Sequence, residues 1–342
     1  MEETQIRSLV SRATKNVGDI VTLSIEHVPP QKALVVYDTS AGLARILMEA
    51  YRTVLPHATF IDFDTVTKEE VIAAFGTMGP GDLVVLIQSS NFLLNEFRIR
   101  LHLFSKKLKV IEHMHLYRNT KDVWDVYIDA LAYDKDWYRR VGPLLKSKLE
   151  NIDELRIGAM GKELVVTGGL ESPKLNIGDY AGMENVGGTF PIGEVFTEGK
   201  DFTRMNGSVM IYAFAGGDFC VNMHEPFRID IKDGIVISWA EDAPKGFTDI
   251  VEAIRLYERP LIREIGFGLN RAITKERYLQ DITAFERIYG MHLSMGEKHS
   301  VYKKEGIPTS KTKFHVDLFP VVEYVTADGA FVYDQGRYVV HE

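Results

Sequence analysis

Strand-like and helix-like segments alternate in the first third of the sequence, and this alternation is the feature that most restricts the fold. Four apolar runs are candidates for strands: 33–38, 59–63, 83–87 and 110–116. The segments between them carry apolar residues at helical spacing. Such alternation predicts a parallel sheet with helices on both faces. We therefore expect residues 1–158 to form an α/β domain of the flavodoxin or Rossmann kind, with helices over 120–158.

Polar residues follow several of these runs. Ser40, Ser89, Ser90 and Asn91 stand where strands of a parallel sheet end, so they are either turn and cap residues or the lining of a cleft. His113 and His115 alternate in the fourth run. They are either a metal-binding pair or ordinary polar groups at a strand end, because nothing nearby supplies a third ligand. No phosphate-binding glycine motif follows a strand, which weighs against a nucleotide site.

The pattern changes after residue 158 to short strands separated by glycine turns. Asp233-Gly234 between two apolar runs predicts a hairpin. Helices are expected near 246–258 and 275–288. Residues 159–342 are thus predicted to be a β-rich α+β domain, and the whole chain to be α/β with two domains.

Composition limits the classes of function. The 342-residue chain has 45% hydrophobic residues and a net charge of -8, which fits a globular protein and argues against a nucleic-acid binder. One cysteine, Cys220, excludes a disulfide framework within the chain and favours a reducing compartment. No apolar run approaches the ~20 residues of a membrane span, and the N-terminus lacks a signal-peptide layout. We expect a cytoplasmic protein without a nucleic-acid or membrane partner.

Histidines and carboxylates gather in the second half. Glu264 precedes Gly266 and Gly268, whose missing side chains allow close approach of backbone and ligand. His292 lies in a later apolar run. His315 and Asp317 share one face of a strand because side chains repeat every second residue. Imidazole and carboxylate without thiolate are the ligands of a hydrolytic zinc, cobalt or manganese site, or of non-haem iron.

Glu194 completes the set. It follows a loop rich in glycine and proline and enters an apolar strand, where a carboxylate needs a partner. Each residue alone fits a structural role. One zinc ion needs three protein ligands, whereas five ligands suit two metal ions. The metal-ligand prediction is therefore Glu194, Glu264, His292, His315 and Asp317.

These motifs, in this order, resemble the ligand motifs of the M29 metallopeptidases, the aminopeptidase T group, over about residues 180–335. The resemblance implies a metalloprotease, specifically a cytoplasmic homodimeric aminopeptidase that holds two divalent ions, Zn or Co, with Mn or Fe as alternatives. Its substrate would be a peptide or small amide. Glu264 would be the carboxylate nearest the attacking water. Members carry a tyrosine seven residues after the histidine of the Gly-x-His motif, but here that position is His299. His299 or Tyr302 would then stabilise the oxyanion.

Two other interpretations remain open, of which the first is a mononuclear non-haem iron ring-cleaving dioxygenase or another repurposed enzyme on the same scaffold. The dihydroxypyridine ring-cleaving dioxygenases are similar through this half and hold one iron with two histidines and one carboxylate. In them a histidine stands where this chain has Glu264, and the positions of Glu194 and His292 carry no ligand. The third interpretation is a non-catalytic binding protein that keeps the fold.

Overall fold

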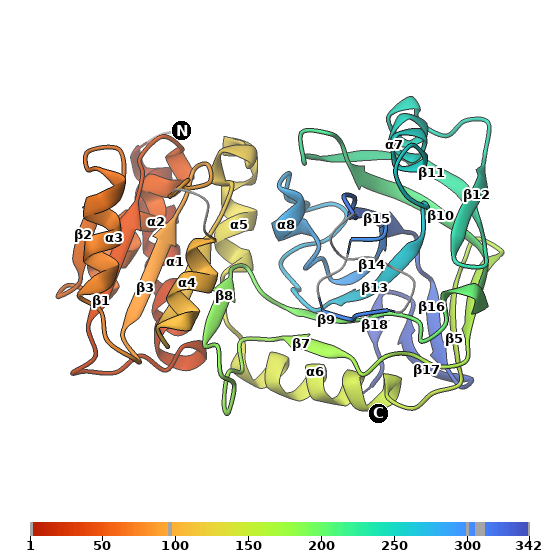
Figure 1. Cartoon of the computed structure of the whole chain (residues 1–342), viewed down its shortest axis with the longest axis horizontal. Helices are drawn as coiled ribbons and strands as arrows, with labels where there is room; N and C mark the ends of the chain where they lie inside the picture. The colour runs from red at the N-terminus through yellow and green to blue at the C-terminus, as the bar shows by residue number, and fades with distance from the viewer. Residues whose placement is uncertain (1–2, 95–97, 299–300, 305–311, 341–342) are drawn as a thin grey trace. The chain divides into compact units, whose positions relative to one another are not determined.

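The computed structural model describes residues 3–94, 98–298, 301–304 and 312–340 (Figure 1). The chain forms two compact units. Unit 1 comprises Met1–Arg139, Gly178–Ile192 and Lys275–Ala284, and unit 2 comprises Arg140–Ile177, Gly193–Thr274 and Phe285–Glu342. The single boundary expected after residue 158 therefore differs from this division. Each unit is built from separate stretches of the chain, which local sequence patterns do not reveal.

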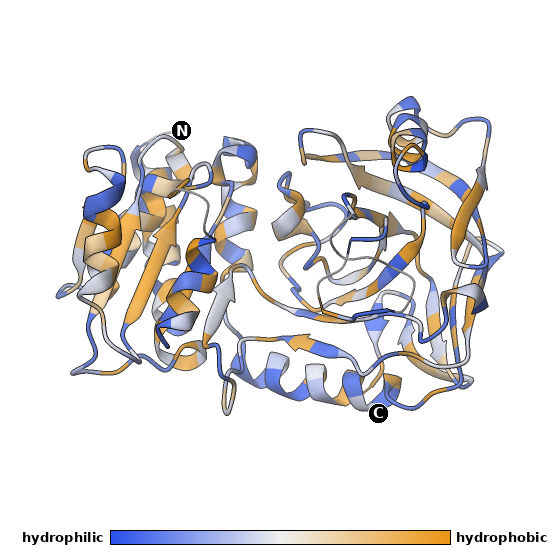
Figure 2. Cartoon of the chain, in the orientation of Figure 1, coloured by the Kyte–Doolittle hydropathy of each residue, from blue (hydrophilic) through white to orange (hydrophobic). Residues whose placement is uncertain are grey.

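Unit 1 contains a five-stranded parallel sheet in the order β2-β1-β3-β4-β8. Its strands are β1 (Ala33–Tyr37), β2 (Thr59–Asp62), β3 (Leu83–Ile87), β4 (Lys109–His113) and β8 (Gly187–Thr189). The first four follow the flavodoxin-like order 2-1-3-4, and the fifth comes from the stretch Gly178–Ile192. Every residue of β3 is buried, and β1 and β3 are hydrophobic along their length (Figure 2), as expected of a sheet covered on both faces.

The helices of unit 1 match the predicted alternation, with differences at their ends. They are α1 (Glu3–Asp19), the π-helical η1 (Ile20–Ser24), α2 (Gly42–Val54), α3 (Lys68–Gly76), α4 (Ile99–Ser105), the 3-10 turns η2 (Leu116–Arg118) and η3 (Lys121–Val123), and α5 (Trp124–Ala130). Helix α3 begins with a capping box: Thr67 Oγ1 accepts from Glu70 N, and Glu70 accepts from Thr67 N. The prediction of an α/β class is confirmed.

Unit 2 is dominated by a large antiparallel sheet that curves strongly (Figure 1). Its strand order is β18-β17-β16-β5-β6-β10-β15-β14-β13-β9-β7, and β11 and β12 extend it from β10. The strands are β5 (Glu154–Ala159), β6 (Lys162–Thr167), β7 (Lys174–Asn176), β9 (Glu194–Thr197), β10 (Met205–Ala215), β11 (Val221–Lys232), β12 (Ile235–Trp239), β13 (Ile262–Gly268), β14 (Gly290–Met295), β15 (Val316–Pro320), β16 (Tyr324–Ala327), β17 (Ala330–Asp334) and β18 (Arg337–Tyr338).

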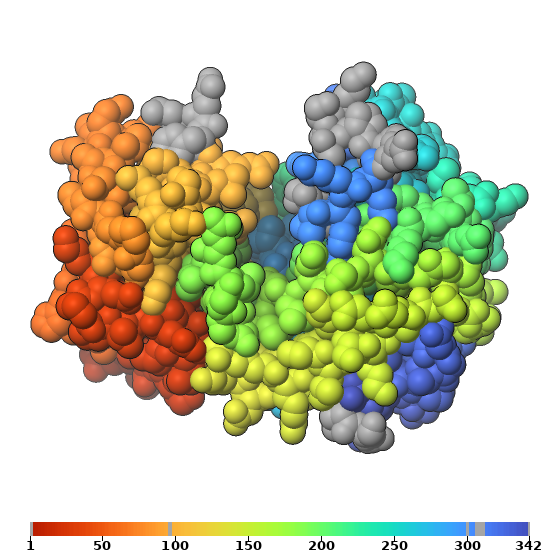
Figure 3. Space-filling view, turned by 60° about the horizontal axis from the view of Figure 1, so that its bottom comes forward, coloured from red at the N-terminus to blue at the C-terminus, as the bar shows by residue number. Residues whose placement is uncertain are grey.

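Distant parts of the chain pair with one another in this sheet. Strand β16 pairs with β5, so residues near the C-terminus lie beside residues near 155 (Figure 3, blue beside yellow-green). The predicted hairpin is confirmed: β11 and β12 are joined through Asp233 and Gly234, both with positive φ. The prediction of helix over 120–158 is wrong at its end, because β5 begins at Glu154.

Three helices remain. These are α6 (Lys135–Leu149), α7 (Lys245–Arg255) and the four-residue α8 (Ile282–Phe285). The predicted helix over 275–288 is therefore much shorter than expected, and Glu286 and Arg287 lie in the turn that follows α8. No helix in the described ranges is long and apolar enough to cross a membrane.

Candidate metal centre

The register of four neighbouring strands, β9, β13, β14 and β15, aligns the predicted ligands. Glu264 is opposite Ser294, and Ser294 is opposite Asp317. Two residues further along β13, Gly266 is opposite His292, and after two more residues Gly268 is opposite Glu194. Because side chains alternate along a strand and align across neighbours, these residues share one face of the sheet. Residues far apart in sequence thus meet on one surface of unit 2.

Interatomic distances show how closely the side chains meet. His292 Nε2 lies 3.2 Å from Glu264 Oε1 and 3.4 Å from Glu194 Oε1. His315 Nε2 lies 3.3 Å from Asp317 Oδ1. Ser294 Oγ donates to Asp317 Oδ1 at 2.6 Å. Glu194, Glu264, His292 and Asp317 are buried, whereas the His315 side chain is 32% exposed.

Two glycines of β13 make room for this arrangement. A Cβ on Gly266 would overlap the imidazole of His292, which lies across the strand. A Cβ on Gly268 would overlap the backbone of Arg287 and Ile288. The expectation that these glycines permit close approach is confirmed. Gly268 in particular lets the turn after α8 pack against β13, and Asn270 N donates to Arg287 O at 3.1 Å.

That turn brings in two residues that the sequence analysis missed. Glu286, Glu194 and His292 offer ligand atoms that lie within 4.8 Å of one another. Arg287 Nη1 lies 2.6 Å from Glu194 Oε2 and 2.7 Å from Glu286 Oε1. Both residues fall in the stretch predicted as helix, and no motif or spacing marks them. Only the packing of the turn against Gly268 reveals their place.

Four carboxylates, Glu194, Glu264, Glu286 and Asp317, form what we call the carboxylate cluster. Burial raises the pKa of Glu194, although Arg287 and His292 oppose this effect. Burial also raises the pKa of Glu286, to about 8. For His292, burial disfavours the charged ring, yet the hydrogen bond to Glu264 and the nearby carboxylates raise its pKa to about 9. The carboxylate cluster therefore strongly stabilises a positive charge that lies among its members.

The donor set fits a divalent metal ion. Carboxylate oxygens and imidazole nitrogens are the ligands of zinc, manganese and non-haem iron. His315 Nδ1 lies 3.2 Å from Lys298 O, a contact that directs Nε2 toward Asp317 as a ligating histidine requires. His292 Nδ1 is buried without a partner among the described residues, while its Nε2 points at two carboxylates.

Two residues, His299 and Tyr302, were predicted to stabilise the oxyanion, and the structure describes one of them. His299 lies outside the described residues. Tyr302 is buried, and its hydroxyl lies 2.7 Å from Ser172 O and 3.3 Å from Phe196 O. Its carbonyl accepts from Arg263 Nη2 at 2.6 Å. Tyr302 thus anchors its own segment to the backbone of unit 2, and its catalytic role stays a prediction.

The polar residues of unit 1 have structural partners. The His113 ring lies between the hydroxyls of Tyr51 (2.9 Å) and Tyr127 (3.1 Å) and is fully buried. Residue 115 lies beyond the strand with a left-handed φ of 53°, so the two histidines are not the pair that strand alternation suggested. The Ser89 hydroxyl bonds to Asp38, and Ser89 Oγ accepts from Ala41 N at 2.7 Å. This favours the turn-and-cap role over a cleft.

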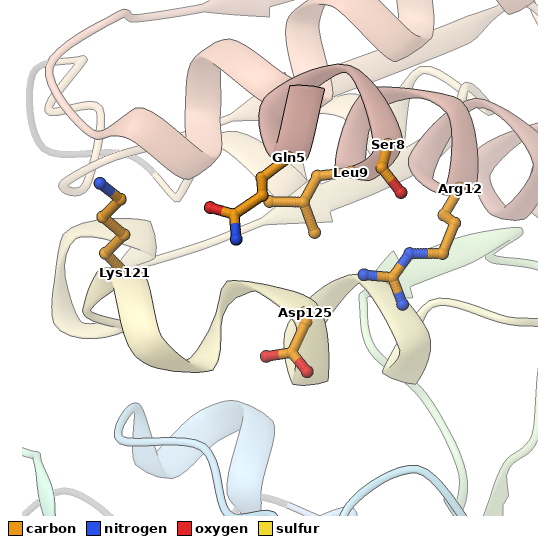
Figure 4. Close-up of a pocket in the computed structure, with 6 residues that line it drawn as sticks. All are labelled: Gln5, Ser8, Leu9, Arg12, Lys121 and Asp125. Carbon is orange, nitrogen blue, oxygen red and sulfur yellow. The ribbon is translucent and has the colours of Figure 1, made fainter. Parts of the chain in front are cut away.

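A surface hollow of about 280 Å³ also lies in unit 1. One helix, α1, lines it with Gln5, Ser8, Leu9 and Arg12, and Lys121 and Asp125 line it from the facing segment (Figure 4). It lacks the imidazole and carboxylate combination found in unit 2.

Comparison with known proteins supports the fold. No family model matches the sequence, and no curated protein matches it. Among solved structures, 2,5-dihydroxypyridine dioxygenase from Pseudomonas putida KT2440 is similar with a TM-score of 0.67 and 15% identity, covering 97% of this chain and 98% of that one. Wild-type AmpT from Thermus thermophilus, an M29 aminopeptidase T, has a TM-score of 0.60 and 12% identity, with 96% and 99% covered. At these identities the similarity shows a shared fold.

Proposed function

We propose that this protein is a metal-dependent hydrolase that cleaves the N-terminal amide bond of peptides or small amides, as an M29-like aminopeptidase does. The observation that carries the proposal is the alignment of Glu194, Glu264, His292 and Asp317 on one face of four neighbouring strands. The fold shared with AmpT agrees with it. In the dioxygenases, as described above, the positions of Glu194 and His292 carry no ligand and a histidine stands where this chain has Glu264.

The proposed ligands are Glu194, Glu264, His292, His315 and Asp317, for Zn²⁺ or Co²⁺, with Mn²⁺ or Fe²⁺ as alternatives. A bound divalent ion would polarise the scissile carbonyl and lower the pKa of a bound water toward about 7. Glu264 would accept the proton of the attacking water at a carboxylate oxygen and pass it to the leaving amine. The hydrogen bond between Ser294 and Asp317 would hold that carboxylate in place. The number of ions that the site holds also depends on Arg287, because this cation lies in the cluster.

Turnover tests this proposal. Protein loaded separately with Zn²⁺, Co²⁺ or Mn²⁺ is expected to release free amino acid from a panel of dipeptides and amino-acid amides. Glu264→Gln should lower kcat by at least about 100-fold, in the range of general-base catalysis. Glu225→Gln, an exposed position on β11, is the control. No turnover with any metal would contradict the proposal and favour a non-catalytic binding protein.

A second function is supported by the similarity to the dioxygenase, which has the higher TM-score. His315 and Asp317 supply one histidine and one carboxylate of the set that non-haem iron oxygenases use. The second histidine would be His292, from a position that carries no ligand in the dioxygenases. If this function holds, protein loaded with Fe²⁺ should consume dioxygen with an aromatic diol, and Glu194→Gln should leave that rate unchanged. The M29 resemblance also implies a cytoplasmic location and a homodimer, and both stay predictions. Light scattering of the purified protein tests whether it is a homodimer.

A further inference from the structure

Arg287 lies among groups that would otherwise bind metal. Its Nη1 is 2.6 Å from Glu194 Oε2 and 2.7 Å from Glu286 Oε1, so one nitrogen bridges two carboxylates. The side chain is only 9% exposed. A guanidinium stays charged at any working pH. The cluster therefore contains a permanent cation of its own.

The position of this cation divides the cluster into two halves. Glu194, Glu286 and His292 form the arginine half, and their ligand atoms lie within 4.8 Å of one another. His292 stands at its border, because its Nε2 lies 3.4 Å from Glu194 Oε1 and 3.2 Å from Glu264 Oε1. Both carboxylates of this half are ion-paired with Arg287. Glu264, His315 and Asp317 form the other half, in which Asp317 is held by Ser294 and faces His315.

A divalent ion would meet different conditions in the two halves. In the arginine half it would compete with Arg287 for both carboxylates and would lie beside a like charge in a buried setting, where charges are poorly screened. Displacing Arg287 from these carboxylates is costly, because a buried guanidinium without its carboxylates is strongly disfavoured. In the other half, the ion would meet Asp317, whose neighbours Ser294 and His315 carry no permanent charge.

We propose that Arg287 takes the place of one of two metal ions in this site. The chain then holds one divalent ion tightly, through Glu264, His315 and Asp317, and a second ion only weakly. This inference rests on the proposed metal dependence of the site, and it replaces the expectation of two equivalent ions.

Metal counting tests the proposal. Zn²⁺ or Mn²⁺ is titrated into chelator-treated protein, with calorimetry for affinity and mass spectrometry of dialysed protein for ions per chain. The natural protein should bind one ion tightly and a second at least 100-fold more weakly. Arg287→Met keeps the apolar stem but not the charge, and it should tighten the second ion at least 10-fold. Arg287→Lys should keep one tight ion. Arg255→Met, which removes an arginine paired with Glu252 on α7, is the matched control.

The outcomes separate this inference from the proposed function. Two ions of equal affinity in the natural protein, or a second ion that stays weak in Arg287→Met, would overturn the role of Arg287. No metal binding at all would instead overturn the metal-dependent function. If Arg287→Met does not fold, two other variants decide. Glu194→Gln should change the affinity of the tight ion by less than 3-fold, whereas Asp317→Asn should weaken it at least 100-fold. Equal losses in both variants would contradict the division into halves.

Discussion

Gly266 and His292 face each other across β13 and β14, and the imidazole occupies the space where a side chain at position 266 would lie. A Cβ there would come within 3.0 Å of three ring atoms, a distance that real Cβ atoms essentially never show. His292 Nε2 reaches Glu264 and Glu194 from this position. The absence of a side chain at Gly266 therefore allows the His292 imidazole to lie in this position.

Replacing this glycine should disturb both stability and metal binding. Gly266→Ala is expected to lower the free energy of unfolding by about 1–3 kcal/mol, as overpacking of a core does. It should weaken binding of the tight ion by at least about 10-fold, because the ring must move and its Nε2 lies 3.2 Å from Glu264 Oε1, a proposed ligand of that ion. Gly217→Ala, at a position with open space around its Cβ, is the control. Urea unfolding and metal titration measure the two effects, and unchanged metal affinity would argue that His292 does not hold Glu264 in place for the ion.

The hydrogen bond between Ser294 and Asp317 gives a second prediction. Ser294→Ala should weaken metal binding by about 10–100-fold, the usual effect of losing a group that orients a ligand. Ser238→Ala is the matched control, since Ser238 Oγ also donates to an aspartate, Asp230, at 2.6 Å but away from the cluster. If both variants change metal affinity equally, Ser294 does not orient Asp317 for metal.

More of the fold than of the candidate site could be predicted from the sequence. Local patterns are enough for β3, α3 and the hairpin at Asp233, because apolar runs, capping residues and turn residues act over a few positions. The division into units was not predictable in this way, since β8 joins its sheet from the stretch Gly178–Ile192.

The candidate site shows the same limit. Four of the five predicted ligands stand in strands, where alternation fixes the face of each side chain, and the fifth, His315, comes directly before β15. Glu286 and Arg287 stand in a turn, and their place depends on contact with Gly268 from a different segment. Charge pairing across such contacts leaves no periodic signal in the sequence.

Buried His113 predicts a loss of stability in acid. Tyr127 donates to Phe190 O at 3.2 Å, so its oxygen accepts from His113 Nδ1, and Tyr51 donates to Nε2. Burial lowers the pKa of His113 from 6.5 to about 3. The unfolded chain then binds a proton that the folded chain does not, so stability is retained above pH 6.5 and falls toward pH 3, by at most about 1.4 kcal/mol per pH unit.

Variants isolate this contribution from that of the carboxylates. Urea unfolding at pH 7 and pH 5 should show a smaller loss of stability in His113→Asn than in the natural protein. His57→Asn replaces an exposed histidine of the same unit and should behave like the natural protein. The same pH dependence in all three proteins would contradict a neutral His113.

Proton release should accompany metal binding. In the metal-free protein burial disfavours the charged ring of His315, yet Asp317 raises its pKa to about 10, so the ring is protonated at pH 7. Its nitrogen must lose that proton to bind the tight ion, and the affinity should rise with pH, up to about 10-fold per unit for each proton released, until about pH 10. Calorimetry in two buffers of different ionisation enthalpy counts the protons. His224→Asn, a histidine of β11, should leave the count unchanged, and binding without proton release would show that His315 is not a ligand.

The stability of the metal-free protein should change with pH in the opposite direction. The raised pKa of His315 adds stability that is fully present below the unfolded value of about 6.5 and is lost as pH rises through about 10.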